Sequence, residues 1–289
     1  MTLSDADHQN LSADLRSLGE AIAEALRNDR IELAFQPQYD TRGSGVRGFE
    51  ALARWRRIDG ALVSAGHFID AIEAMGLIGD LGDYVLRKAC EAGARLVETN
   101  RPTLIAVNIS ATQLERPDFA DHVKAEIARA SLDPELIEIE LTEHVAVQDV
   151  HRAAEQMRPL RELGVRFALD DFGAGYATLS ALAALPFDAV KLDRSLIAEI
   201  DTAPQSRRLV EAVMAVARTW RMEVVAEGVE RGEQLAVLQL IGCRAVQGYH
   251  LGKPAGEAEM MAMIDDAWAI EEIPPASLDT LARHGFVIK

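Results

Sequence analysis

The stretch that decides the fold runs from Arg166 to Ser180 and reads Arg-Phe-Ala-Leu-Asp-Asp-Phe-Gly-Ala-Gly-Tyr-Ala-Thr-Leu-Ser. A short apolar run ends abruptly in two adjacent carboxylates, Asp170 and Asp171, and two glycines follow them. A helical pattern then begins near Ala177. This order of apolar run, acid pair, glycine loop and helix is typical of one strand–helix unit of a parallel sheet.

The acid pair has two interpretations. Asp170 and Asp171 could simply cap the loop and the next helix. Alternatively they hold a cation, because adjacent carboxylates at the end of a buried strand repel one another and stay ionised only beside positive charge. The rest of the chain favours the second interpretation.

Eight strand patterns alternate with helical patterns along the chain. Strands that alternate with helices form a parallel sheet, and about 250 residues is the usual size of a closed eightfold barrel. We therefore predict an α/β fold of the (β/α)8 TIM-barrel type. The runner-up, an open doubly wound sheet, lacks support because no Gly-x-Gly-x-x-Gly follows the first strand. The predicted strands cover residues 31–39, 46–55, 104–110, 136–141, 167–169, 189–193, 223–226 and 244–251.

The link between the first two strands departs from a regular barrel. It spans Asp40 to Val46, is glycine-rich and is too short for a crossover helix, so the first strand should run antiparallel to the second. We divide the chain into an N-terminal helix packed on the barrel (1–30), the barrel (31–268) and a C-terminal extension of unassigned role (269–289). The predicted helices lie near residues 11–27, 67–75, 81–99, 118–130, 150–163, 177–185, 205–219, 233–241 and 257–268.

A polar or ionisable residue stands at the carboxyl end of nearly every predicted strand. In a barrel these ends meet on one face, where the active sites of this fold lie. Any one of them could be an exposed loop residue or a helix cap, but several sit inside apolar runs that must point inward. The set comprises Glu50, Asn108, Glu140, Asp170, Asp171, Lys191, Glu227 and Gln247.

Five carboxylates and one amide of this set, close together, predict a site for hard cations. Oxygen-only ligands favour magnesium or manganese over zinc. An adjacent acid pair suits two metal ions about 3.5–4 Å apart, the arrangement that clamps a phosphoryl transfer. Lys191 and Arg54 are then the cations that meet phosphate oxygens, although Lys191 could instead form a structural salt bridge. Glu138 shares a strand face with Glu140, and the sequence does not reveal its partner.

Composition limits the partners and the compartment. The chain of 289 residues has 46 acidic and 30 basic residues, a formal net charge of −16, which argues against a nucleic-acid polymer or an anionic membrane as main partner. No apolar run reaches the ~20 residues of a membrane span, and the acidic start is unlike a signal peptide. Cys90 and Cys243 are far apart, so free thiols in a reducing compartment, the cytoplasm, are expected.

The segment Glu50-Ala-Leu-Ala-Arg-Trp55 resembles the signature of the EAL family, phosphodiesterases that act on cyclic di-GMP. The resemblance continues in order and spacing over roughly residues 11–268. It is carried further by Gln36-Pro37, Val107-Asn-Ile-Ser110, Glu140-Leu-Thr-Glu143, Asp170-Asp-Phe-Gly-Ala-Gly-Tyr176, Lys191-Leu-Asp193, Ala226-Glu-Gly-Val-Glu230, Gln247-Gly-Tyr249 and Gly252-Lys-Pro254.

The resemblance implies a role for each matched residue. Lys191 resembles the residue that positions the attacking water, and it would act with Glu227 and Asp171. Glu143 resembles a glutamate that binds no metal but holds the loop that begins at Asp171. The implied ligands of the first metal are Glu50, Asn108, Glu140 and Asp170; those of the second are Asp170, Asp171 and Glu227. The implied substrate contacts are Gln36, Leu52, Arg54, Glu230, Gln247 and Pro254.

The implied reaction is hydrolysis of one phosphodiester of cyclic di-GMP to linear pGpG by water that two magnesium or manganese ions activate. A degenerate module that only senses the nucleotide is the alternative, but such a module should have lost a metal ligand, and none is missing. A catalytically idle interaction protein is a third reading. The resemblance also implies a homodimer and, in a longer parent protein, a sensory or cyclase domain. The helix predicted near 177–185 suits close packing, although ordinary barrel packing explains it equally.

Overall fold

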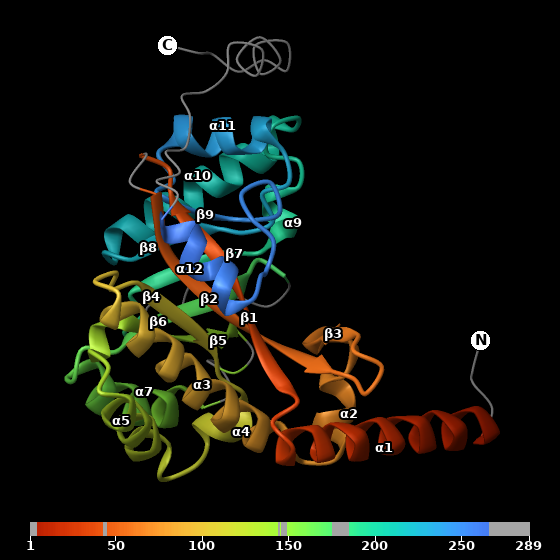
Figure 1. Ribbon diagram of the computed structural model, residues 1–289. Helices are drawn as coiled ribbons and strands as arrows, with labels where there is room; N and C mark the ends of the chain where they lie inside the picture. The colour runs from red at the N-terminus through yellow and green to blue at the C-terminus, as the bar shows by residue number, and fades with distance from the viewer. Residues whose placement is uncertain (1–4, 43–44, 144, 146–148, 175–184, 266–289) are drawn as a thin grey trace.

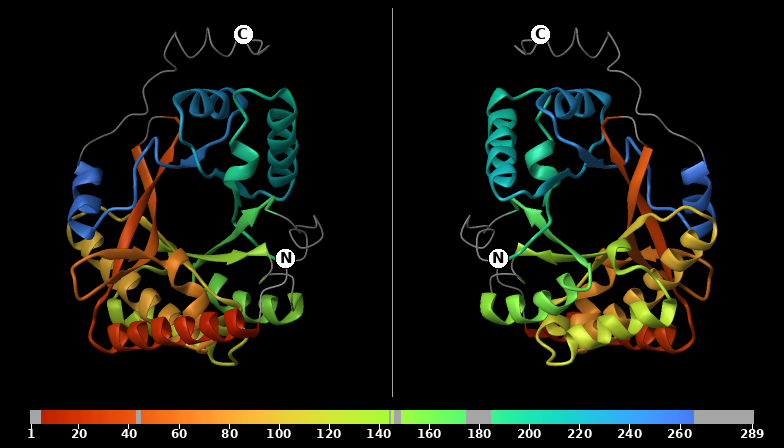
Figure 2. Two further views of the ribbon diagram at one scale, coloured as in Figure 1. Left: turned by 90° about the vertical axis from the view of Figure 1, so that its right-hand side faces the viewer. Right: turned by 90° about the vertical axis from the view of Figure 1, so that its left-hand side faces the viewer.

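Eight strands close into a barrel that helices surround (Figure 1, Figure 2). The computed structural model describes residues 5–42, 45–143, 145, 149–174 and 185–265. Each strand pairs with the next around a ring, in the order β1, β9, β8, β7, β6, β5, β4, β2 and back to β1. The strands are β1 (Ile31–Asp40), β2 (Gly45–Arg56), β4 (Leu104–Asn108), β5 (Ile137–Thr142), β6 (Arg166–Phe172), β7 (Ala189–Leu192), β8 (Glu223–Ala226) and β9 (Ala245–Gln247).

The predicted antiparallel start of the barrel is confirmed. β1 runs antiparallel to β2 and to β9, whereas β2 and β4–β9 form parallel pairs around the ring. The link of a few residues between β1 and β2 permits only a hairpin, since a parallel pair needs a longer crossover. The sequence analysis missed β3 (Leu62–Ser64), a three-residue strand that pairs with the end of β2 outside the ring.

The longer helices fall where apolar periodicity predicted them, within a few residues at most ends, whereas two four-residue helices, Ala111–Leu114 and Arg194–Ile197, were not predicted. Outside the ring, α1 packs against α2, and the approach is close: a Cβ on Gly19 would lie 2.2 Å from the Met75 sulfur. The described helices are α1 (Asp5–Arg27), α2 (Ile69–Ala74), α3 (Ile78–Glu98), α4 (Ala111–Leu114), α5 (Phe119–Ala130), α7 (Val150–Arg161), α9 (Arg194–Ile197), α10 (Pro204–Thr219), α11 (Gly232–Ile241) and α12 (Glu257–Asp265), with 3-10 turns at Ala65–His67 and Pro134–Leu136.

The barrel buries its apolar side chains between the sheet and the helices. Phe49 on β2, Ile105 on β4 and Phe167 on β6 are fully buried in this layer. Because side chains alternate along a strand, the neighbouring positions point into the barrel. These inward positions carry the polar residues at the strand ends.

Two predictions lie outside the described residues. The helix expected near 177–185 lies almost entirely outside the described residues. So do the whole extension 269–289 and the end of the last predicted helix. The division into residues 1–30, 31–268 and 269–289 stays a prediction. Among the described helices, none combines the length and the apolar character needed to cross a bilayer.

Candidate active site

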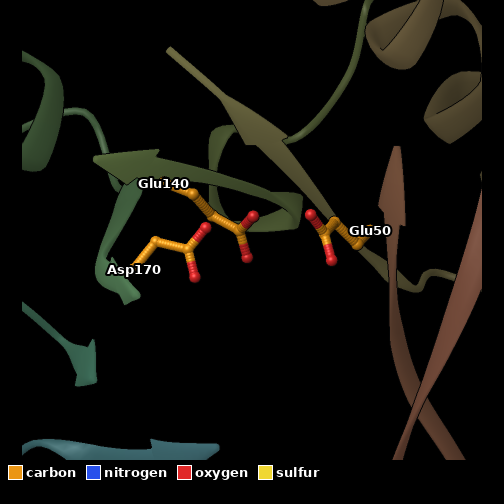
Figure 3. A group of neighbouring side chains, drawn as sticks. All are labelled: Glu50, Glu140 and Asp170. Carbon is orange, nitrogen blue, oxygen red and sulfur yellow. The ribbon is translucent and has the colours of Figure 1, made fainter. Parts of the chain in front are cut away.

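The carboxylates predicted from the strand ends converge inside one end of the barrel. Glu50 from β2, Glu140 from β5 and Asp170 from β6 each offer an oxygen atom, and these three atoms lie within 4.8 Å of one another (Figure 3). A second group of three, with the same spacing limit, joins Asp170 to Asp171 and Glu227. Asp170 therefore belongs to both groups, as a ligand that bridges two ions would.

Lys191 lies in the middle of this acid cluster. Its Nζ atom is 2.7 Å from Glu140 Oε1, 2.8 Å from Glu227 Oε1, 3.2 Å from Asp170 Oδ1 and 3.5 Å from Glu50 Oε2. The lysine side chain is only 1 % exposed, so solvent screens these contacts little. With Asp171, the cluster holds five carboxylates against a single ammonium group. That is a formal charge of −4, which two divalent cations would balance.

Burial and mutual repulsion separate the pKa values of the carboxylates. Burial raises the pKa of Glu140 well above its usual range and raises the pKa of Glu227 to about 8. For Glu50 burial acts in the same direction, but Lys191 and two amide hydrogen bonds outweigh it and lower the pKa. Burial lowers the pKa of Lys191, yet the four surrounding carboxylates reverse this effect and raise it well above its usual value. Lys191 therefore stays charged.

These shifts predict how the stability of the metal-free protein depends on pH. Glu227 titrates near 4.5 when exposed and near 8 in the fold, so the unfolded chain loses this proton first. Its contribution to the free energy of unfolding is fully present below about pH 4.5 and is lost as the pH rises through about 8. We expect the melting temperature in EDTA to fall between pH 5.5 and 8, and to fall less with saturating Mn²⁺. A melting temperature that rises over this range in EDTA would contradict the assignment.

Amide side chains orient Glu50. Asn108 Nδ2 donates to Glu50 Oε1 over 2.8 Å, and Gln247 Nε2 donates to Glu50 Oε2 over 2.6 Å. Gln247 Nε2 also lies 3.2 Å from Gln36 Oε1, and Gln36 Nε2 lies 3.4 Å from the Gly252 carbonyl oxygen. The structure thus places Gln247, predicted as a substrate contact, directly against the acid cluster, and Gln36, also predicted as one, against Gln247.

The end of β6 bends sharply at Asp171. The φ angle of Asp171 is 56°, in the left-handed region that a residue other than glycine rarely occupies, and such strain is typical of functional sites. Gly173 follows with φ 104°, and a Cβ there would lie 2.5 Å from Leu196 Cδ1. The backbone N–H of Asp171 donates to Asp170 Oδ1 over 2.9 Å. The bend turns Asp171 outward, while Asp170 stays buried.

The cluster has the chemistry of a metal centre. Glu140 is fully buried, and its Oε2 atom accepts no hydrogen bond from any described residue. A buried carboxylate oxygen without a donor is costly unless a cation meets it. The ligand set consists of oxygen atoms, which magnesium and manganese prefer. The residues present therefore fit one or two hard divalent cations.

Three of the remaining predicted substrate contacts line pockets. Arg54 and Pro254 line one groove of about 860 Å³, and Leu52 lines a separate pocket of about 580 Å³ together with Asn108. Arg54 is half-buried and forms no ion pair with a carboxylate among the described residues; its guanidinium donates to its neighbour's carbonyl oxygen. Burial lowers the pKa of Arg54, but an arginine stays charged. Glu230 is exposed, and its backbone N–H donates to Gln234.

Two predictions about neighbouring glutamates have different outcomes. Glu143 is buried beyond the end of β5, but part of the loop that it was expected to hold lies outside the described residues, so its role stays a prediction. Glu138, whose partner the sequence did not reveal, accepts from Arg166 Nε over 3.1 Å. Glu138 and Arg166 lie opposite one another in the register of the parallel strands β5 and β6. Glu138 therefore belongs to an ion pair below the cluster.

Tyr249 was not predicted as a site residue. It is 60 % exposed, and Lys253 Nζ lies 5.8 Å from its ring centre. It is a large exposed aromatic residue two positions after Gln247, and that position was the signal that could have identified it. Its neighbour Gly248 admits no side chain, because a Cβ would lie 2.2 Å from the Val229 carbonyl oxygen. The loop that carries Tyr249 is thus held close to the loop after β8.

The EAL domain family model matches residues 19–254. The chain belongs to the EAL domain family. A relative from Pseudomonas aeruginosa, the cyclic di-GMP phosphodiesterase NbdA, is 37 % identical over 257 residues, which cover 89 % of this chain and 33 % of NbdA. The signaling protein YkoW of Bacillus subtilis is 34 % identical over 233 residues, 81 % of this chain and 29 % of YkoW. This EAL chain spans about a third of the length of the curated relatives it matches.

Solved structures agree with the fold. The PaMucR phosphodiesterase in complex with c-di-GMP is 33 % identical, with a TM-score of 0.80 over 84 % of this EAL chain and 99 % of that chain. The EAL enzyme Bd1971, in its cAMP- and cyclic-di-GMP-bound form, is 28 % identical, with a TM-score of 0.82 over 90 % of this chain and 72 % of that chain. The predicted barrel with its antiparallel first strand is therefore the fold of the family.

Proposed function

We propose that this chain is a phosphodiesterase specific for cyclic di-GMP, which hydrolyses one phosphodiester to give linear pGpG with two Mg²⁺ or Mn²⁺ ions. The observation that carries the proposal is the complete carboxylate cluster around the buried Lys191, with its formal charge of −4. Relatives named as cyclic di-GMP phosphodiesterases support the choice of substrate.

In this proposal Glu50, Asn108, Glu140 and Asp170 hold one ion, and Asp170, Asp171 and Glu227 hold the other. Such ions lower the pKa of a bound water and neutralise charge on the phosphate. Lys191 keeps its proton at Nζ and orients the attacking water by hydrogen bonding. Arg54, whose charge no described carboxylate pairs, binds a non-bridging phosphate oxygen. Gln36, Leu52, Glu230, Gln247 and Pro254 hold the rest of the nucleotide.

Incubation of the pure protein with cyclic di-GMP and Mn²⁺, followed by separation of the products, tests the proposal. We expect pGpG to accumulate, and EDTA to stop the reaction. Intact substrate after long incubation would refute the enzyme. Nucleotide binding without turnover would instead support a sensor of cyclic di-GMP.

Glu143 should govern the loop after β6 without binding metal. A buried carboxylate beyond β5 can accept backbone N–H groups of that loop through charge-assisted hydrogen bonds. Without this tether Asp171 should shift, and a shift of ~1 Å in such a site can lower the rate ~10²-fold. We therefore expect Glu143→Ala to lose most of kcat, while the affinity for the nucleotide and for the first metal changes far less.

The measurement is kcat and nucleotide affinity for the same variant over a range of Mn²⁺ concentrations. Glu162→Ala, a change beyond the end of α7 and outside the cluster, serves as the control and should match the parent protein. A near-normal kcat for Glu143→Ala would make Glu143 a helix cap. Complete loss of first-metal binding would make it a ligand.

We also propose that the protein is a homodimer. The segment 177–185 consists of Ala, Leu, Thr and Ser up to Leu185, and such small residues suit close packing between helices. Light scattering coupled to size exclusion should give twice the mass of the chain at micromolar concentration. A monomer at every concentration tested would remove this proposal. A sensory or cyclase domain in a longer parent protein is our proposed source of the controlling signal, and a stand-alone enzyme is the alternative.

A further inference from the structure

Gln38 on β1 is the most anomalous polar residue inside the barrel. Its side chain is fully buried, and neither its Nε2 nor its Oε1 atom has a hydrogen-bond partner among the described residues. A buried amide without partners carries a free-energy cost that native proteins avoid, usually by means of other polar groups or ordered water. The amide of Gln38 therefore needs a hydrogen-bond partner other than a protein side chain.

The complementary group is Gln247 on the neighbouring strand. The Nε2 atom of Gln247 donates to Glu50 and Gln36, but its Oε1 atom is buried and accepts from no described residue. Gln38 offers donor hydrogens, and Gln247 offers an acceptor oxygen. The Nε2 atom of Gln38 thus lacks an acceptor, and the Oε1 atom of Gln247 lacks a donor.

The register of the sheet places these two residues opposite one another. Gln38 pairs with Gln247 between the antiparallel strands β1 and β9, and directly opposed residues on one face have Cβ atoms about 4.5–5.5 Å apart. On its other side Gln38 pairs with Gly48 of β2, which offers no side-chain hydrogen-bond partner. Gln36, two residues earlier on the same strand face, contacts Gln247 directly, so this face points into the barrel. The space between the two amides is polar on both sides.

We infer that ordered water occupies this position and bridges Gln38 Nε2 to Gln247 Oε1, and that Gln38 thereby positions Gln247 against Glu50. A buried water needs a polar site and makes two to four hydrogen bonds. The bridging water accepts from Gln38 Nε2 and donates to Gln247 Oε1, while Gln38 Oε1 accepts from a neighbouring water. Gln38 is then a positioning residue, separated from Glu50 of the acid cluster by three hydrogen bonds, through the water and Gln247.

Replacement of Gln38 by methionine distinguishes a hydrated bridge from a dry, unsatisfied amide. Methionine has nearly the same shape and no polar group. If water forms hydrogen bonds with Gln38, the water loses these hydrogen bonds in the variant. The melting temperature of the metal-free protein should then fall by about 2–4 °C. If Gln38 is dry, the variant removes an unsatisfied amide, and the melting temperature should rise.

The positioning role has a separate readout. With Gln38→Met we expect the affinity for Mn²⁺, measured by calorimetry without nucleotide, to fall about 10-fold, as is typical when a partner behind a metal ligand is lost. Gln156→Met is the matched control. Gln156 is also buried, but Ala120 N–H and the Arg116 carbonyl oxygen satisfy it directly, and it lies on α7 outside the acid cluster. That control should lower the melting temperature without changing the affinity for Mn²⁺.

The outcomes separate this inference from the proposed function. A rise in the melting temperature of Gln38→Met overturns the water bridge. An unchanged affinity for Mn²⁺ in that variant overturns the positioning role, which rests on the proposed metal centre. A parent protein that binds no Mn²⁺ contradicts the proposed function, while the sign of the thermal shift still decides on the bridge. If the variant does not fold, a high-resolution crystal structure of the parent protein decides: water within hydrogen-bond distance of both amides supports the bridge, and a direct or dry contact overturns it.

Discussion

Lys191→Met is expected to lower the stability of the metal-free protein more than any other single change in the site. Lys191 Nζ lies between four carboxylates and is almost fully buried. Without it the five carboxylates of the cluster have no cation, and loss of one partner from a buried ion pair typically costs about 3–5 kcal/mol. Since 1 kcal/mol shifts the melting temperature of a domain near this size by about 2–4 °C, we expect a fall on the order of 10 °C in EDTA.

Saturating Mn²⁺ should restore much of this loss. Cations bound to the cluster supply the positive charge that the ammonium group supplied, and a ligand that binds only the folded state stabilises it by mass action. The thermal shift caused by Mn²⁺ should therefore be larger in Lys191→Met than in the parent protein. Hydrolysis should stay very slow even at saturating metal, because nothing then orients the attacking water.

Lys88→Met is the control for the loss of one lysine charge. Lys88 pairs with the exposed Asp29 at 3.1 Å, and exposed pairs contribute at most about 1 kcal/mol. Its melting temperature, its response to Mn²⁺ and its activity should all stay close to those of the parent protein. If Lys191→Met melted in EDTA within a degree or two of Lys88→Met, the picture of an acid cluster held together by one ammonium group would be wrong.

The part of the site that the sequence predicts is the part that strand ends determine. Glu140 and Asp170 stand near the carboxyl ends of β5 and β6, and Glu50 stands near the end of the part of β2 that pairs with β4. Any barrel built from those strands must bring them together. Such an inference needs only the positions of the strands in the sequence and the knowledge that neighbouring strands run parallel. For the same reason the short hairpin link was enough to predict the antiparallel first strand.

Features that depend on register could not be predicted in this way. The pairing of Glu138 with Arg166 follows from the offset between β5 and β6, and the contact between Gln247 and Gln36 follows from the offset between β9 and β1. Side-chain patterns state which face a residue occupies but not which residue of the next strand stands opposite. The short strand β3 was missed because three residues give no periodicity.

Glu138 and Glu140 allow the sharpest comparison in the molecule, because they lie on one face of one strand and are both fully buried. Glu140 lies in the acid cluster, where burial raises its pKa and Lys191 is its nearest partner. Glu138 pairs with Arg166 outside the cluster. The same chemical change, glutamate to glutamine, should therefore have opposite consequences at the two positions.

Glu140→Gln should lower kcat roughly 10²–10³-fold, the range typical for removal of one preorganised electrostatic group. In EDTA its melting temperature should equal or exceed that of the parent protein. The reason is that the change removes one of five crowded negative charges, while Lys191 keeps Glu227 at 2.8 Å and Asp170 at 3.2 Å. A gain in stability with a loss of activity is the pattern expected where a site is built for function at the expense of stability.

Glu138→Gln should do the reverse. Arg166 loses its ion pair with the fully buried Glu138 and, among the described residues, keeps an ion pair only with Glu223 at 3.4 Å. The melting temperature should therefore fall while kcat stays within a few-fold of the parent value. Steady-state kinetics with Mn²⁺ and thermal unfolding in EDTA give the kcat and the melting temperature of each variant, which are the four values to compare. If both variants lost the same activity, a general disturbance of strand β5, and not the loss of a carboxylate from the acid cluster, would explain the loss. A destabilised but fully active Glu140→Gln would make Glu140 a structural residue and leave the proposed metal centre without one of its central ligands.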